Sequence, residues 1–265
     1  MVGRFSGKVA IITGSSFGIG RETALLFAKE GAKVTVTGRN EERLQGTRQA
    51  LLDSGIPETN ILIVPADITT SSGQDTLISK TLERFGKLDI LVNNAGASIP
   101  DSQKRTGINQ GIETYEQVMR LNVQSVIEMT QKVRPHLAKS KGDIVNVSSI
   151  VALKAGWSRT PYYPLAKAAL DQYTRSAAID LIHEGIRVNT VNPGIVATGF
   201  HGNATGLSSD ASQKVTFLSI QYKNDHLSST MTWDQIHLQF HVDSQDVQSI
   251  YLGLHAQFPR QTEKL

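Results

Sequence analysis

The sequence predicts a single α/β domain of the doubly wound type, in which helices cover both faces of a parallel β-sheet. Two observations predict it. The first two hundred or so residues alternate between short apolar runs and helical segments, and the apolar runs are continuous instead of alternating with polar residues. Continuous hydrophobicity is typical of strands buried on both faces, and repeated strand–helix units are typical of parallel sheets. A chain of 265 residues, 39% of them apolar, can bury one large core.

Strands and helices are expected in strict alternation. The strands are expected at 9–13, 33–37, 61–66, 88–94, 143–149 and 186–193, and the helices at 18–30, 41–53, 73–85, 113–138 and 163–184. β-branched residues dominate the strand segments, as in VAIIT and KVTVT. Ligands of such sheets bind beyond the carboxyl ends of the strands, so the loops that follow the strands form the candidate site. A parallel sheet with another connectivity would fit the same pattern.

The composition excludes several classes of function. The net charge is only +3, and the basic residues are mixed with acidic ones along the chain, so a nucleic-acid-binding surface is not expected. The absence of cysteine excludes disulfides and thiolate metal sites. The apolar stretch near the start is too short for a signal peptide or a membrane span. We therefore expect a cytoplasmic protein with no metal and with neither a nucleic-acid nor a membrane partner.

A glycine-rich turn follows the first expected strand. Its sequence is TGSSFGIG, from Thr13 to Gly20, and it opens the first expected helix. In a phosphate-binding turn, Gly14 would permit the tight bend, Gly18 would let the backbone approach a diphosphate, and Gly20 would allow close packing of helix on strand. Glycine is common in any turn, so the spacing alone is weak evidence. The strand–turn–helix setting favours a nucleotide site.

The segment PYYPLAK, residues 161–167, suggests proton transfer. Residues four apart in a helix share a face, so Tyr163 can face Lys167 whereas Tyr162 points elsewhere. A phenol has a pKa near 10, and a cation about 4 Å away at an effective dielectric constant of about 20 would stabilise its anion by about 4 kcal/mol. That charge would bring the pKa of Tyr163 close to neutrality. A surface Tyr–Lys pair without function is the alternative.

Together with two further glycine- and asparagine-rich segments, these motifs follow the order found in one family. The motifs are TGxxxGxG at 13–20, NNAG at 93–96, Asn122, VNVSS at 145–149, YxxxK at 163–167 and NPG at 192–194. From residue 5 to about residue 200 the sequence resembles the short-chain dehydrogenase/reductases. The resemblance implies a Rossmann-type fold and an oxidoreductase that transfers a hydride between a nicotinamide cofactor and a ketone or secondary alcohol.

The resemblance also implies catalytic roles. Tyr163 would pass a proton to or from the substrate oxygen, and Lys167 would support Tyr163 and hold the nicotinamide ribose. Ser149 would hydrogen-bond the substrate oxygen as charge develops on it. Ser148 competes for that role, although the strand alternation favours Ser149. Asn122 would support Lys167 through a water molecule, and a buried asparagine that satisfies helix backbone is the alternative.

Cofactor preference depends on residues 37–40, TGRN. An acidic residue at the end of the second strand would bind the adenosine ribose and repel a 2′-phosphate. Here Gly38 occupies that place and Arg39 follows it, and a guanidinium matches phosphate geometry. We therefore predict NADP(H) in preference to NAD(H). A solvated Arg39 that is drawn away by Glu41 and Glu42 is the alternative.

Further cofactor contacts follow from the resemblance. The full predicted set is Gly14, Ser16, Gly18, Ile19, Gly20, Arg39, Asp67, Asn93, Ala95, Gly96, Tyr163, Lys167, Pro193, Gly194, Ile195 and Thr198. Asp67 would contact the adenine edge, and the backbone of Ile195 would contact the nicotinamide carboxamide. Asn93 and Asn94 can equally stabilise the central turn of the sheet. The substrate wall is expected from residues 97–99, 151–157 and 200–210, with Trp157 and Arg159 as candidates.

Residues 1–214 are expected to form the dinucleotide-binding and catalytic domain, and residues 215–265 an atypical C-terminal segment that departs from the family pattern. The tail contains one glycine, one proline and the histidines His226, His237, His241 and His255. Residues 236–242 alternate as an edge strand would, and His237 and His241 on one face of it fit a solvated strand face better than a metal site. We expect a homo-oligomer, with a dimer better supported than a tetramer. The alternative to an enzyme is a nucleotide-binding protein with little or no turnover because its C-terminus is altered.

Overall fold

The computed structural model describes residues 3–153, 159–194 and 196. The described residues up to Pro193 belong to one compact unit. Several predictions lie outside the described residues. They are the positions Trp157, Ile195 and Thr198, the substrate-wall residues 154–157 and 200–210, the four tail histidines and the boundary between residues 214 and 215.

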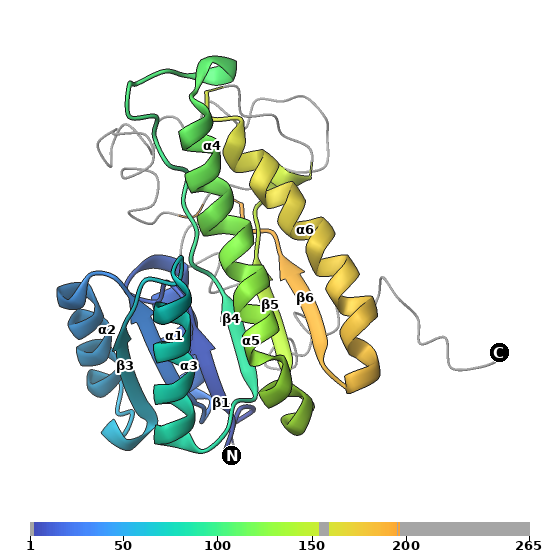
Figure 1. Cartoon of the computed structure of the whole chain (residues 1–265). Coiled ribbons are helices and arrows are strands. Elements are labelled where there is room, and N and C mark those ends of the chain that lie inside the picture. Colours follow the sequence, from blue (N-terminus) through green and yellow to red (C-terminus); the bar gives the residue numbers. More distant parts are fainter. Residues whose placement is uncertain (1–2, 154–158, 195, 197–265) are drawn as a thin grey trace, which may run out of the picture. The chain divides into compact units, whose positions relative to one another are not determined.

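A six-stranded sheet forms the centre of this unit (Figure 1). Its strands are β1 (Val9–Ile12), β2 (Lys33–Gly38), β3 (Ile61–Pro65), β4 (Ile90–Asn93), β5 (Asp143–Val147) and β6 (Arg187–Val191). All pairs are parallel, in the order β3-β2-β1-β4-β5-β6. The strand order reverses between β1 and β4, where Ala10 pairs with Ile90. The doubly wound prediction is confirmed, and this reversal is where such sheets bind ligands.

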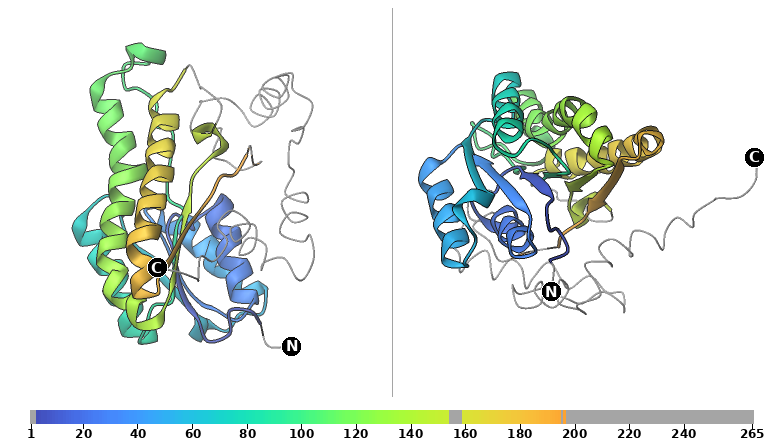
Figure 2. Two further views of the ribbon diagram at one scale, coloured as in Figure 1. Left: turned by 90° about the vertical axis from the view of Figure 1, so that its right-hand side faces the viewer. Right: turned by 90° about the horizontal axis from the view of Figure 1, so that it is seen from below.

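Helices cover both faces of the sheet (Figure 2). They are α1 (Gly18–Lys29), α2 (Glu41–Asp53), α3 (Ser71–Phe85), α4 (Ile112–Met119), α5 (Ser125–Ser140) and α6 (Tyr162–Leu181). The first two cover one face, whereas α3, α5 and α6 cover the other. Within the described residues, no helix combines the length and apolarity that crossing a membrane requires. The same part of the chain holds no cluster of three or more His, Cys, Asp or Glu side chains suited to a metal ion.

The helix predicted over 113–138 is interrupted. A π-helical turn, Arg120–Gln124, separates α4 from α5. The Asn122 side chain supplies the reason, because its Nδ2 donates to Val118 O over 2.9 Å, the carbonyl that the Asn122 N–H would bond in an α-helix. Such turns are rare and are frequently found at functional sites. The sequence pattern predicted the helix but not this break.

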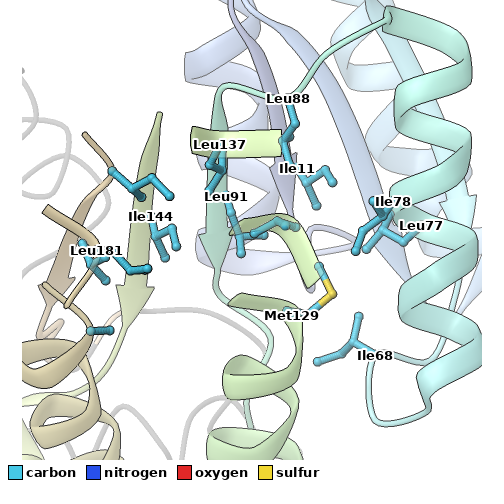
Figure 3. Packing of buried hydrophobic residues seen from close by; sticks show 14 of the residues in the cluster. Ile11, Ile68, Leu77, Ile78, Leu88, Leu91, Met129, Leu137, Ile144 and Leu181 are labelled. Carbon is cyan, nitrogen blue, oxygen red and sulfur yellow. The ribbon is translucent and has the colours of Figure 1, made fainter. Parts of the chain in front are cut away.

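The core forms two layers, one on each face of the sheet. Ile11 of β1 belongs to the cluster under α3, α5 and α6, where it packs with Leu91 and with Met129 of α5 (Figure 3). Its neighbours Ala10 and Ile12 belong to the cluster under α1 and α2. Successive strand residues point to opposite faces, so a strand that is covered on both faces must be apolar at every position. The continuous apolar runs of the sequence are thereby explained.

Candidate active site

The turn between β1 and α1 requires glycine at three positions. Gly14 and Gly18 have φ values of 63° and 58°, in the left-handed region that L side chains avoid. A Cβ added to Gly14 would lie 2.8 Å from Ala95 Cα, and one added to Gly20 would lie 2.4 Å from Asn94 Nδ2. The turn is therefore pressed against the segment that follows β4.

Hydrogen bonds fix this turn to the NNAG segment. The Thr13 hydroxyl accepts the N–H groups of Asn94 and Ala95, both at 3.0 Å. In return, Asn94 Nδ2 donates to Thr13 O at 2.9 Å and to Gly14 O at 3.0 Å. Asn94 thus stabilises the central turn, as one of the two interpretations of NNAG expected.

The amino terminus of α1 suits an anion. Asn40 caps α2 by accepting the N–H of Arg43, and Thr70 caps α3 by accepting the N–H of Gly73. At α1 the cap position is Phe17, no side chain makes a cap hydrogen bond, and the first turn holds no acidic residue. The first amides of a helix and its dipole favour a negative group. Together with the glycine turn, this end of α1 fits the diphosphate of a dinucleotide.

The predicted adenosine side gathers at the ends of β2 and β3. A Cβ added to Gly38 would lie 3.2 Å from Ser16 Oγ, so the two residues are in close contact. Arg39 is exposed. Burial raises the pKa of the Asp67 carboxyl, but the hydrogen bonds from Thr69 N and Oγ1 and the charge of Arg39 outweigh it, and the pKa falls below its ordinary value. Arg39 therefore lies within electrostatic reach of Asp67.

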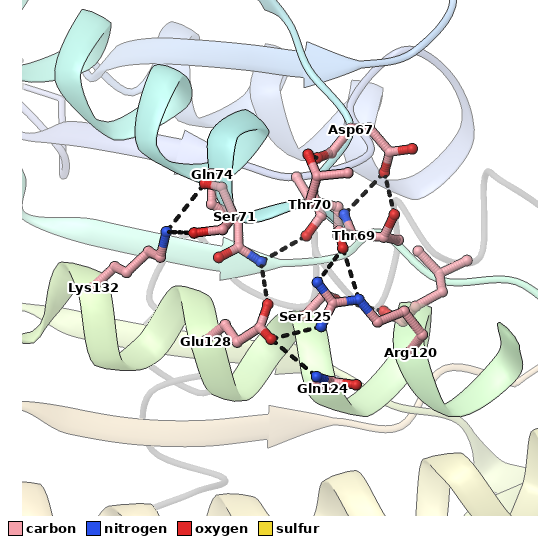
Figure 4. Close-up of polar contacts among 12 residues, drawn as sticks. Asp67, Thr69, Thr70, Ser71, Gln74, Arg120, Gln124, Ser125, Glu128 and Lys132 are labelled. Atoms are coloured by element: carbon pink, nitrogen blue, oxygen red, sulfur yellow. Dashed lines mark hydrogen bonds and ion pairs between the residues drawn. The ribbon is translucent and has the colours of Figure 1, made fainter. Parts of the chain in front are cut away.

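A polar network joins this side to the π-turn (Figure 4). Arg120 Nε donates to Thr69 O at 2.7 Å, and Arg120 Nη1 lies 2.6 Å from Glu128 Oε1. Gln74 Nε2 donates to Glu128 Oε2 at 2.9 Å. The loop that carries Asp67 is thereby connected to the turn that carries Asn122. Arg120 could not be predicted from the sequence, because a basic residue in a helix does not reveal a partner in another loop.

The segment PYYPLAK forms the start of α6, as its spacing predicted. Lys167 Nζ lies 5.7 Å from the centroid of the Tyr163 ring. The Ser149 side chain is hydrogen-bonded to Tyr163. Tyr162 points elsewhere, and its hydroxyl donates to Gln110 O at 2.8 Å. The structure therefore brings Ser149, Tyr163 and Lys167 together and leaves Tyr162 in a structural contact.

The two serines at the end of β5 have different surroundings. Ser148 is buried, and its hydroxyl donates to Lys167 O at 3.2 Å. Ser149 is half-buried, its Oγ accepts the N–H of Val151 at 3.4 Å, and its carbonyl accepts Asn192 Nδ2 at 3.1 Å. The geometry therefore brings Ser149, and not Ser148, to Tyr163.

Asn122 and Lys167 meet at Gly96. A Cβ added to Gly96 would lie 2.6 Å from Asn122 Oδ1 and 3.0 Å from Lys167 Nζ. Asn122 is fully buried, and its amide donates to Ala97 O and Val118 O and accepts the N–H of Ala97. Asn122 satisfies the backbone, as the alternative interpretation proposed, and it does so beside Lys167.

The predicted acidification of Tyr163 is wrong in this structure. Burial raises the pKa of Tyr163 to about 12, and the hydrogen bond with Ser149 opposes that rise only in part. Burial also lowers the pKa of Lys167 to about 8, against the charge of Asp171. The Lys167 ammonium donates to Val147 O at 2.7 Å. Desolvation is thus the largest cause of both pKa shifts.

The remaining predicted positions lie at the same edge of the sheet or follow it in the chain. Asn93 is buried and donates to Asn146 Oδ1 at 2.9 Å, which links β4 to β5. Pro193 O accepts the N–H of Ile150 at 3.1 Å, so the end of β6 lies beside the segment after β5. Gly194 follows directly. In the substrate-wall region, Arg159 O accepts the N–H of Gly107 at 2.9 Å.

Known proteins are similar to this chain in sequence and fold. The short chain dehydrogenase family model matches residues 8–206. A short-chain dehydrogenase/reductase from Caenorhabditis elegans, crystallised with cofactor, is 59% identical over 83% of this chain and 81% of its own, with a TM-score of 0.79. Apo glucose dehydrogenase from the same organism is 54% identical over 80% of this chain and 82% of its own, with a TM-score of 0.66.

A relative of known activity is also similar in sequence. L-fucose dehydrogenase from Rattus norvegicus is 35% identical over 209 residues, which are 79% of this chain and 73% of that protein. The residues matched by the family model include the glycine turn at 13–20 and the YxxxK segment at 163–167. The chain therefore belongs to the short-chain dehydrogenase family, whose members are oxidoreductases that use nicotinamide cofactors on alcohol and carbonyl groups.

Proposed function

We propose that the chain is an NADP(H)-dependent oxidoreductase that interconverts a ketone and a secondary alcohol, with Tyr163 as general acid and base. The observation that carries the proposal is the convergence of Ser149, Tyr163 and Lys167, with Lys167 beside Gly96 of the NNAG segment. The glycine turn and the uncapped start of α1 fit the dinucleotide diphosphate. When bound, the nicotinamide would supply or accept the hydride.

The side chains divide the proton transfer between them. With a pKa of about 12, Tyr163 is protonated at neutral pH and can give its proton to a carbonyl oxygen. Ser149, already hydrogen-bonded to Tyr163, supplies a second donor to the same oxygen. Lys167, with a pKa of about 8, is mostly charged at pH 7 and stabilises the phenolate that remains. In the oxidation of an alcohol the same groups work in reverse.

The preference for NADP(H) rests on Arg39 and Gly38. Gly38 carries no carboxylate to repel a 2′-phosphate, and Arg39 is exposed and close enough to lower the pKa of Asp67. Arg39→Ala should weaken NADPH binding about 10- to 100-fold, the loss of one or two charge-assisted hydrogen bonds, and should change NADH binding little. Arg43, whose guanidinium lies 5.2 Å from the Phe17 ring centroid, offers a matched control as Arg43→Ala. Equal losses of NADPH and NADH binding would refute the assignment.

The substrate class follows from the relatives. Because L-fucose dehydrogenase and glucose dehydrogenase are among them, we propose a sugar or polyol hydroxyl, or the corresponding carbonyl, as the reacting group. A panel of such compounds should be screened with NADPH and NADP⁺. Tyr163→Phe should lower turnover about 100- to 10,000-fold and keep dinucleotide binding, whereas Tyr162→Phe should keep both. Unchanged turnover in Tyr163→Phe would overturn the mechanism.

Dinucleotide binding with no turnover on any substrate would favour the alternative, a nucleotide-binding member of the family without activity. Assembly into a homo-oligomer, with a dimer better supported than a tetramer, remains a prediction. Light scattering of the purified protein would test it. A cytoplasmic location also remains a prediction, which imaging of the tagged full chain in cells would test.

A further inference from the structure

We propose that Asp171 is a positioning residue for the reaction, a buried carboxylate that sustains the charge of Lys167 and fixes Ser149 through Asn192. The inference rests on the proposed function and extends it by one residue that belongs to none of the motifs TGxxxGxG, NNAG, VNVSS, YxxxK and NPG. Asp171 stands four residues after Lys167 in α6, so both side chains leave the helix on the same face, about 6 Å apart along its axis.

Asp171 is unusual as a buried acid. Asp171 is 4% exposed to solvent, and Lys167 is 3% exposed. Isolated buried carboxylates are costly and need compensating partners. Asn192 Nδ2 lies 2.9 Å from Asp171 Oδ2, and Thr190 Oγ1 lies 3.4 Å from Asp171 Oδ1. None of the ion pairs within 4.0 Å among the described residues includes Asp171.

The same amide reaches the active site. Asn192 Nδ2 also donates to Ser149 O at 3.1 Å, so one side-chain nitrogen connects Asp171 on α6 with the backbone of Ser149 after β5. Asn192 lies directly after β6. The Asp171 carboxylate thereby orients an amide that holds Ser149 in place, and Ser149 in turn is hydrogen-bonded to Tyr163.

The electrostatic part concerns Lys167. Burial disfavours its charged form, and the Asp171 carboxylate acts in the opposite direction. Among the described residues, the titratable groups that the structure places beside Lys167 are Tyr163 and Asp171 on its own helix. The side chain from the π-turn is the neutral amide of Asn122, and the NNAG segment presents Gly96. Asp171 is therefore the anion that keeps Lys167 protonated at neutral pH.

Asp171→Asn tests this directly, because asparagine keeps the shape and one acceptor oxygen but removes the charge. In the full chain labelled with [ε-¹³C]lysine, the signal assigned by its loss in Lys167→Met should titrate with a pKa lower by about 1 or more in Asp171→Asn. Asp180→Asn removes the same charge from the exposed side of α6 and should leave that titration and the activity unchanged. An unchanged Lys167 pKa in folded Asp171→Asn would overturn the electrostatic part.

Asn192→Ala tests the mechanical part. It leaves the Asp171 side chain in place and removes the bond to Ser149 O, so kcat should fall about 10-fold while the KM for the dinucleotide stays the same. An unchanged kcat would overturn this part. The titration of Lys167 requires no turnover. If the protein reduces no carbonyl compound, the proposed function is refuted, but the titration still shows whether Asp171 stabilises the charged form of Lys167.

Discussion

The burial of Lys167 should appear as a pH-dependent stability difference between the wild type and Lys167→Met. Lys167 is 3% exposed, and burial lowers its pKa from 10.5 to about 8. At 1.36 kcal/mol for each pKa unit, the difference of about 2.5 is worth about 3 kcal/mol. This is a large fraction of the stability of a typical domain.

The sign follows from proton binding. Between pH 8 and 10.5 the unfolded chain binds the Lys167 proton more tightly than the folded protein does, so the free energy of unfolding rises with pH in this window. Below pH 8 the cost of burying the charge is fully present, and above 10.5 it vanishes. Methionine has no proton to lose, so Lys167→Met should lack this rise.

Urea unfolding at several pH values from 7 to 10.5 measures the effect. The stability of the wild type minus that of Lys167→Met should increase by about 3 kcal/mol across the range. Subtracting the two curves removes the titration of all other groups and the loss of the bond to Val147 O. Lys139→Met, at an exposed position in α5, serves as the control and should give a curve parallel to the wild type. Parallel curves for Lys167→Met would refute the reasoning.

Three further substitutions test the neighbourhood of the site. Tyr162→Phe removes the bond to Gln110 O and should lower the free energy of unfolding by about 1 kcal/mol in urea, with turnover unchanged. Gly96→Ala would bring a Cβ to 2.6 Å from Asn122 Oδ1 and 3.0 Å from Lys167 Nζ, so kcat should fall about 10-fold or more, and wild-type kinetics would contradict this packing. Asn122→Ala leaves buried backbone groups unpaired and should cost about 2–3 kcal/mol of unfolding free energy, which thermal or urea unfolding would show.

The strands and the glycine turn could be predicted because local patterns specify them. Apolar runs without alternation are required wherever both faces of a strand are covered, and Gly14 and Gly18 are required by their left-handed backbone. The pairing of Tyr163 with Lys167 was predictable for the same kind of reason, since helical spacing alone brings residues four apart together.

Contacts between distant segments were beyond local patterns. The π-turn depends on the amide of Asn122, which bonds both the preceding helical turn and Ala97, twenty-five residues earlier. In the sequence, Arg120 has the pattern of an ordinary helix residue. Its hydrogen bond to Thr69 O depends on the fold, which brings the Thr69 loop next to it. Asp171 likewise finds its amide partner on another element, after β6.

The pKa values of Tyr163 and Lys167 could not be predicted from the sequence either. Spacing indicated that Lys167 is near Tyr163, and Coulomb's law then gave a large stabilisation of the phenolate. Desolvation depends on how many atoms surround each group, and that number follows only from the packed fold. In the structure it raises the pKa of Tyr163 to about 12 and lowers that of Lys167 to about 8. At that pKa Tyr163 is protonated at neutral pH.

The most direct measurement follows a label from the cofactor to the product. The protein would be incubated with NADPH dideuterated at C4 and with a carbonyl compound from the sugar panel, and the product analysed by mass spectrometry. We predict one deuterium on the new carbinol carbon with the wild type and a loss of about 100-fold or more in the rate of its appearance with Tyr163→Phe. An alcohol without deuterium, or equal labelling rates in the two proteins, would contradict hydride transfer assisted by Tyr163.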